Sequence, residues 1–108
     1  MSMILNLKGW FEEHLEDHKA EDIQVIDVRE RTPFAEYYVL ASANNIRQLG
    51  ALSDLVEEAL EKKKYAVNHV EGTPESGWIL IDAYHVIINI FSKEERERVS
   101  LDQVLTRK

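Results

Sequence analysis

The sequence predicts an α/β domain in which a mixed sheet of about five strands carries helices on its faces. Apolar residues recur at helical spacing in two long stretches, short β-branched runs lie beside them, and the segments follow the order αββαβββα. The chain has 108 residues, 44% of them hydrophobic and 31% charged, which suffices for one buried core. We therefore expect a single domain over residues 1–108.

The first half of the chain is expected to hold one helix and two strands. An apolar stripe at three- and four-residue steps predicts a helix over about residues 3–19. The β-branched segment 22–28 and the segment 37–43 predict strands, and Thr32-Pro33 places a turn within 29–36.

A long helix is expected next. Asn44 and Asn45 are N-cap candidates, and apolar residues repeat at helical spacing from Ile46 to Leu60. Three lysines at positions 62–64 suit the negative end of the helix dipole.

Three more strands and a short helix complete the predicted order. We expect strands at 66–70, 78–82 and 86–91, with a loop over 71–77. The last two strands are almost continuously apolar, which predicts central positions covered on both faces. A serine followed three residues later by a glutamate, in Ser92-Lys93-Glu94-Glu95, predicts a capped helix.

Charge and composition exclude several classes of protein. Twenty acidic and thirteen basic residues give a net charge of −7, which disfavours general binding to nucleic acids or anionic membranes. The absence of cysteine excludes disulfides, thiolate metal sites and a cysteine nucleophile. The N-terminus has no signal- or transit-peptide character, and no apolar run approaches the roughly 18–20 residues of a membrane span. We expect a cytoplasmic protein with a basic protein partner.

Two patterns of residues could carry chemistry. His14 and His18 share a helical face that could bind zinc, but no third ligand accompanies them and a solvated acidic face is the preferred interpretation. Asp27 and Asp82 end strands and could hold magnesium for phosphoryl transfer, but no glycine-rich phosphate cradle and no Asp-x-Asp pair accompanies them. We expect no metal, no cofactor and no catalysis. The alternative is a small nucleotidyltransferase-like enzyme that binds a nucleotide.

Trp78 is the most informative single residue. It follows a polar loop and begins an apolar strand, so it is either a core side chain or an interface anchor. Nothing in the residues themselves separates these two interpretations.

Most of the chain, about residues 3–105, resembles the ribosomal silencing factor family, also called Iojap-like. Two segments of the N-terminal half, 22–28 and 42–48, are similar to the family's first strand and to its strand-to-helix crossing. In the C-terminal half the resemblance rests on Glu71-Gly72, Trp78 to Asp82, the strand that ends at Phe91, Glu94-Glu95-Arg96, and Arg98.

This resemblance implies a fold with nucleotidyltransferase-like topology that lacks the catalytic equipment. It implies binding to the large ribosomal subunit through its protein fourteen (uL14), which blocks the small subunit and silences translation when nutrients fall. Trp78 matches the family tryptophan implicated in that contact. The residues expected at the partner surface are Trp78, Glu71, Asp82, Phe91, Glu95 and Arg98. Phe91 could equally be core, and a homodimer that overlaps the same face is compatible with this reading.

The sequence departs from the family pattern at two informative places. Tyr84-His85 occupies the turn between the last two long strands, where the family usually has Gly-Asp, and a turn with positive φ is costly without glycine. Asn89 occupies the position of a family histidine in the following strand. We expect the first change to alter contacts of the hairpin and to leave the strand of Trp78 untouched.

Overall fold

The computed structural model of the chain describes residues 9, 10, 13, 15, 19–33 and 35–99. Its elements in chain order are β1 (Glu21–Asp27), β2 (Tyr37–Ala43), α2 (Ile46–Lys62), β3 (His69–Glu71), the 3-10 turn η1 (Pro74–Ser76), β4 (Trp78–Ala83), β5 (Val86–Ser92) and α3 (Lys93–Val99). Of the helix predicted over 3–19, residues 9, 10, 13 and 15 are described and helical. The rest of that prediction lies outside the described residues.

The strands form one mixed sheet in the order β1-β2-β5-β4-β3. β2 and β5 are parallel, whereas the other three neighbouring pairs are antiparallel. A parallel pair needs a long connection, and here the chain passes through α2, β3 and β4 before β5 returns beside β2. The predicted α/β class and five-stranded mixed sheet are therefore confirmed.

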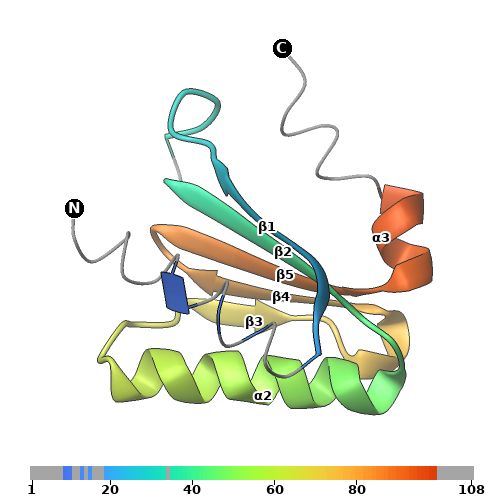
Figure 1. The fold of residues 1–108 in the computed structure, drawn as a ribbon. Helices are drawn as coiled ribbons and strands as arrows, with labels where there is room; N and C mark the ends of the chain where they lie inside the picture. Colours follow the sequence, from blue (N-terminus) through green and yellow to red (C-terminus); the bar gives the residue numbers. More distant parts are fainter. Residues whose placement is uncertain (1–8, 11–12, 14, 16–18, 34, 100–108) are drawn as a thin grey trace.

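Helix α2 begins where the sequence predicts. Asn45 has an extended backbone, and its side-chain oxygen accepts a hydrogen bond from the Gln48 backbone N–H at 2.8 Å. The buried side of the helix carries Leu49, Leu52 and Val56, which pack in the core cluster against the sheet. Figure 1 shows α2 lying along one face of the sheet.

The two faces of the sheet have different compositions because side chains alternate along each strand. The face toward α2 is apolar and almost fully buried; its strand residues include Val39, Ala41, Ile79, Ile81, Val86, Ile88 and Ile90. The opposite face, which we call the second face, carries the alternate residues, and the strand register places them beside one another. They include Gln24, Leu40, Ser42, His69, Glu71, Trp78, Leu80, Asp82, Ile87, Asn89 and Phe91.

The prediction that the last two strands are covered on both faces is right for β5 and wrong for β4. In β5 only Ile87 and Ser92 are partly exposed. In β4, Ile79 and Ile81 toward α2 are buried and only the last residue of that face, Ala83, is partly exposed, whereas every β4 residue of the second face is partly exposed. The reason is position: β5 lies in the middle of the sheet, whereas β4 is flanked by the short edge strand β3.

The third strand also differs from its prediction over 66–70. It consists of His69–Glu71, and all three residues are exposed. Pairing with β4 decides these limits, because His69 lies opposite Asp82 and Glu71 opposite Leu80. The sequence pattern contains no signal for that register.

Helix α3 covers one end of the second face (Figure 1). The predicted serine cap is present, since Ser92 Oγ accepts a hydrogen bond from the Glu95 backbone N–H at 3.1 Å. Arg96 is buried and donates hydrogen bonds to Ser42 Oγ at 3.1 Å and Gln24 Oε1 at 3.3 Å. These bonds attach α3 to both β2 and β1.

Candidate partner-binding surface

Trp78 lies half-buried at the start of β4, on the second face. Its ring packs on Phe91, its register partner in β5, with ring centroids 4.9 Å apart and an interplanar angle of 35°. Its indole Nε1 donates a hydrogen bond to Asn89 Oδ1 at 3.0 Å. Trp78 is thus held by two contacts with β5 while the residue stays partly exposed, an arrangement suited to an anchor whose conformation is fixed before binding.

The loop before Trp78 leaves no room for a side chain at either of its two glycines. Gly72 and Gly77 have φ of 89° and 82°, and a Cβ on Gly77 would lie 2.8 Å from Glu95 Cγ. A Cβ on Gly72 would lie 2.0 Å from the Trp78 carbonyl oxygen. The backbone N–H of Ser92 donates to the Gly77 carbonyl at 2.8 Å. These contacts set where β4 begins and hence where Trp78 stands.

The segment between the two glycines contains a 3-10 turn that the sequence did not predict. Thr73 Oγ1 accepts from the Ser76 backbone N–H at 3.3 Å, and Ser76 Oγ accepts from the Thr73 backbone N–H at 3.3 Å. This reciprocal cap makes the loop a defined turn.

Glu71 and Asp82 lie at the β3 edge of the second face, in different surroundings. Glu71 is exposed, and its Oε2 is 3.0 Å from His69 Nε2. The Asp82 side chain is only 19% exposed, and its two oxygens accept from the Tyr84 backbone N–H at 2.9 Å and Asn68 Nδ2 at 3.1 Å. Asp82 therefore stabilises the neighbouring turn, whereas Glu71 is open to a partner.

Glu95 and Arg98 form an exposed ion pair on α3. The Arg98 guanidinium donates two hydrogen bonds to the Glu95 carboxylate, each at 2.8 Å. These bonds lower the pKa of Glu95 and raise the pKa of Arg98. Because Gly77 lies against the Glu95 side chain, this pair adjoins the start of β4.

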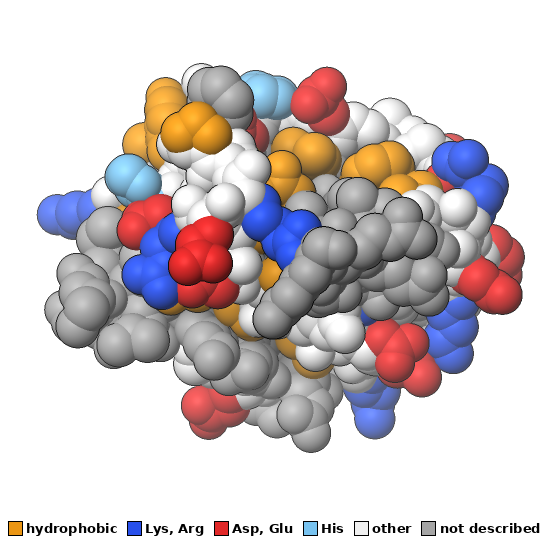
Figure 2. Space-filling model, turned by 90° about the horizontal axis from the view of Figure 1, so that it is seen from above, with side chains coloured by type: hydrophobic (Ala, Val, Ile, Leu, Met, Phe, Trp, Pro, Cys, Tyr) orange, Lys and Arg blue, Asp and Glu red, His pale blue; other side chains and the backbone are white. Residues whose placement is uncertain are grey.

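Phe91 is fully buried, so of the two interpretations left open by the sequence its position is that of a core residue. It supports the Trp78 ring and does not itself reach the surface. The structure therefore brings Trp78, Phe91, Glu95 and Arg98 to one end of the second face. Figure 2 views the molecule from the side opposite α2, where acidic and basic side chains lie among exposed hydrophobic ones.

The carboxylates considered for a metal site do not meet. Asp27 in β1 and Asp82 in β4 are separated by three strand spacings, about 14 Å, with β2 and β5 between them. Within the described part of the chain no group of three or more potential metal ligands occurs. His14 and His18 lie outside the described residues.

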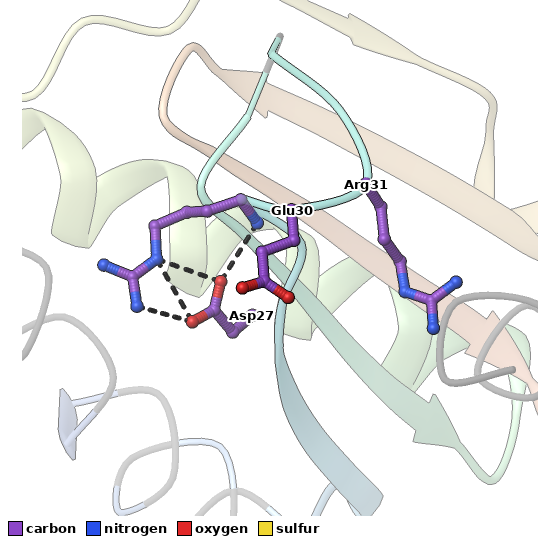
Figure 3. Close-up of a pocket in the computed structure, with 4 residues that line it drawn as sticks. Asp27, Glu30 and Arg31 are labelled. Carbon is purple, nitrogen blue, oxygen red and sulfur yellow. Dashed lines mark hydrogen bonds and ion pairs between the residues drawn. The ribbon is translucent and has the colours of Figure 1, made fainter. Parts of the chain in front are cut away.

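The carboxylate of Asp27 forms an ion pair with the nearby Arg29. Its carboxylate accepts hydrogen bonds from Arg29 Nε at 3.0 Å and from Arg29 Nη2 at 2.6 Å, and these lower its pKa (Figure 3). The open cavity beside it, of about 940 Å³, is lined by Asp27, Arg29, Glu30 and Arg31. This mixed lining gives no excess of positive charge for a phosphate.

Two solved structures share this fold. A crystal structure of a protein from Chromobacterium violaceum has a TM-score of 0.89 at 24% identity and covers 97% of this chain and 88% of its own. A structure from Bacillus halodurans has a TM-score of 0.80 at 20% identity, with 93% of each chain covered. At these identities the likeness shows the fold alone.

Sequence comparison identifies the family. The chain is 27% identical over 89 residues to ribosomal silencing factor RsfS of Bacillus subtilis, covering 82% of this chain and 75% of the relative. It is 30% identical over 90 residues to RsfS of Zymomonas mobilis, covering 83% and 68%. The family model described as ribosomal silencing factor during starvation matches residues 4–107. The chain belongs to this family.

The chain is also similar to plant proteins named Iojap. The chain is 28% identical over 85 residues to the chloroplastic protein Iojap of Zea mays, covering 79% of this chain and 37% of that protein. The resemblance expected from the sequence is therefore confirmed. In the described part of the chain, no helix is long and apolar enough to cross a membrane.

The sequence interpretation did not include Leu80 and Arg96 among the residues of the Trp78 surface, and it left the effect of Asn89 on that surface open. Leu80 lies two positions after Trp78 and shares its face, so strand periodicity could have placed it there. Asn89 is the one polar residue between Val86 and Phe91, which is a signal in itself. The burial of Arg96 has no sequence signal, since the residues around it in α3 are charged and exposed or half-buried.

Proposed function

We propose that this chain represses translation under nutrient limitation by binding the large ribosomal subunit through uL14 and sterically blocking the small subunit. Membership of the silencing-factor family supports this role. In this proposal the protein is a cytoplasmic regulator that covers a surface of the large subunit. Its mechanism requires a binding surface complementary to that of the subunit, and no reactive groups.

The observation that carries the proposal is the support beneath Trp78. A half-buried tryptophan packed on Phe91 and bonded to Asn89 presents a fixed apolar ring. Leu80 extends this apolar centre along β4, and Glu71, Glu95 and Arg98 lie around it. An apolar centre with a polar rim is the usual anatomy of a protein interface.

Charge favours a basic ribosomal protein as the direct partner. The net charge of −7 attracts basic surfaces at a distance and repels exposed RNA phosphates. Exposed Glu71 at the β3 edge is the proposed contact for a basic side chain of uL14. Asp82 belongs to the proposed surface through its position, although its oxygens already hold the turn.

A homodimer through the same face remains compatible with this proposal. Such a dimer would cover Trp78 and compete with the large subunit, so dimer formation would lower the concentration of binding-competent protein. The two associations are distinguishable by their dependence on protein concentration.

Co-sedimentation tests the proposal. Wild-type protein is expected to pellet with large subunits, to be absent from small subunits, and to reduce the joining of the two. Trp78→Ala is expected to weaken binding by about 2 kcal/mol or more, roughly 30-fold. Tyr84→Ala is the matched control. Tyr84 is aromatic like Trp78 and is 50% exposed, but it follows the opposite end of β4.

Two results would contradict the proposal. If the wild-type protein fails to bind large subunits, family membership reports fold and ancestry without this activity. If Trp78→Ala folds normally and binds as tightly as Tyr84→Ala, the anchor lies elsewhere on the molecule.

A further inference from the structure

Asn89 has an unusual hydrogen-bonding state for a residue in the middle of a sheet. Its side chain is fully buried in β5, and its amide nitrogen Nδ2 makes no hydrogen bond. Among the side chains that the structure describes, it is the one buried polar atom in this state. Buried polar groups are nearly always paired, so this exception requires an explanation.

The neighbours of Asn89 explain why its Nδ2 is unpaired. Register places Leu40 of β2 and Leu80 of β4 on either side of Asn89, and Ile87 and Phe91 flank it on the same face of β5. None of these four side chains carries a hydrogen-bond acceptor. A leucine at position 89 would complete an apolar row and remove the unpaired donor.

The other end of the same amide has a partner. The indole nitrogen of Trp78 can only donate a hydrogen bond, so the group facing it at 3.0 Å must be the Asn89 oxygen. This contact fixes the orientation of the amide and thereby turns Nδ2 toward the apolar side. The unpaired Nδ2 is thus the cost of the bond to Trp78.

We propose that Asn89 is a positioning residue that fixes the orientation of the Trp78 indole for partner binding. This inference rests on the proposed function of Trp78 as the anchor. Ring packing on Phe91 leaves the indole free to rotate or slide, because the torsion that sets an aromatic ring plane is broad. The directional bond to Asn89 selects one orientation, so the surface presented to the partner is set before contact.

A consequence is that stability and binding are opposed at position 89. Asn89→Leu removes a buried unpaired donor and fills the row with apolar atoms, so its thermal midpoint is expected to stay equal or rise. The same change frees the Trp78 indole, so binding to the large subunit is expected to weaken. A purely structural role for Asn89 predicts that stability and binding change together.

The first test uses the free protein and requires no ribosome. In ¹⁵N-labelled protein the Trp78 indole N–H is expected to exchange with solvent at least about tenfold more slowly than an exposed indole. Asn89→Leu should remove this protection and shift the Trp78 indole resonance, while the Trp10 indole serves as an internal control. Asn89→Asp keeps an acceptor oxygen, and because burial among apolar side chains favours the neutral acid, it should retain the protection at low pH. Unprotected exchange in the wild-type protein overturns the proposal without any variant.

The second test is a double-mutant cycle on large-subunit binding. Trp78→Phe keeps an aromatic ring on Phe91 but removes the donor N–H. Asn89→Leu is expected to weaken binding roughly 3- to 10-fold when Trp78 is present, and less than about twofold in the Trp78→Phe background. An equal effect in both backgrounds overturns the positioning role. If the wild-type protein does not bind large subunits, the proposed function fails, while the exchange measurement still decides whether Asn89 holds the indole.

Discussion

Tyr84 has a positive φ of 64°, and the Asp82 carboxylate accepts its backbone N–H at 2.9 Å. Tyr84 and His85 form the two-residue turn between β4 and β5, and of the two only Tyr84 has a positive φ. A positive φ at the first central residue is the feature of a type II′ turn, where glycine is preferred. The turn therefore keeps a glycine-type conformation without glycine, and Asp82 helps to hold it.

Tyr84→Gly is expected to stabilise the protein. A non-glycine residue in this region costs about 1–2 kcal/mol, and the greater entropy of glycine in the unfolded chain offsets part of that gain. Because the Tyr84 side chain is 50% exposed, little packing is lost. Urea unfolding should show a gain of about 0.5–1 kcal/mol. A lower unfolding free energy would mean that the Tyr84 ring makes contacts that outweigh the strain.

Arg96→Met is expected to destabilise the protein by about 2 kcal/mol, because its charged hydrogen bonds to Ser42 and Gln24 are lost and the buried Ser42 hydroxyl loses its partner. Arg98→Met is the matched control on the same helix. Its guanidinium is exposed and pairs with Glu95 on the same helix, so the free energy of unfolding should not change measurably. Equal effects of the two variants would show that Arg96 does not attach α3 to the sheet.

The Glu21–Lys93 ion pair predicts a pH-dependent contribution to stability. The carboxylate of Glu21 lies 2.9 Å from Lys93 Nζ, and this bond lowers the pKa of Glu21 below its usual 4.5. The folded state therefore binds this proton less readily than the unfolded state, so the contribution is present above pH 4.5 and is lost as the pH falls through the lowered pKa. Glu21→Gln should lower the thermal midpoint at pH 7, and the difference from wild type should shrink as the pH falls below 4.5.

Added salt provides the control for this pair, because both side chains are about half exposed. At high ionic strength the difference between wild type and Glu21→Gln should shrink at pH 7. A difference that persists unchanged at low pH would assign the effect of the variant to something other than the charge of Glu21.

Features that depend on local signals could be predicted from the sequence, whereas features that depend on strand register could not. The N-cap at Asn45, the Ser92 cap of α3 and the limits of β2 depend on residues within a few positions, and all agree with the structure. The contact between Trp78 and Asn89 joins residues eleven apart through the pairing of two strands. No local pattern specifies which residues become register partners, so the support beneath Trp78 could not be predicted.

The burial of single residues could not be predicted from the sequence for the same reason. Phe91 could be read as surface or core, and only the position of β5 between β2 and β4 decides for the core. The carboxylate of Asp82 was expected to face a partner, but the turn at Tyr84 uses it. The sequence thus predicted the strand that carries Trp78 and left open which side chains of the proposed surface are exposed.

Gly77→Ala is expected to disturb both stability and the proposed binding. The φ of 82° is unfavourable for alanine, and the added Cβ would lie 2.8 Å from Glu95 Cγ and 2.9 Å from Ser92 Oγ. Together these effects should lower the unfolding free energy by about 2 kcal/mol or more. Because Gly77 directly precedes Trp78, a shift at this point displaces the ring, and large-subunit binding should weaken by more than the loss of folded protein explains.

Gly9→Ala is the control for the Gly77 variant. Gly9 is helical and, among the residues that the structure describes, nothing lies within 4 Å of a Cβ at this position, so alanine should leave binding unchanged and raise stability by up to about 1 kcal/mol. Binding of Gly77→Ala should therefore be compared at equal concentrations of folded protein, measured by circular dichroism. If Gly77→Ala then binds like Gly9→Ala, the loop before β4 tolerates displacement and the position of Trp78 is set by Phe91 and Asn89 alone.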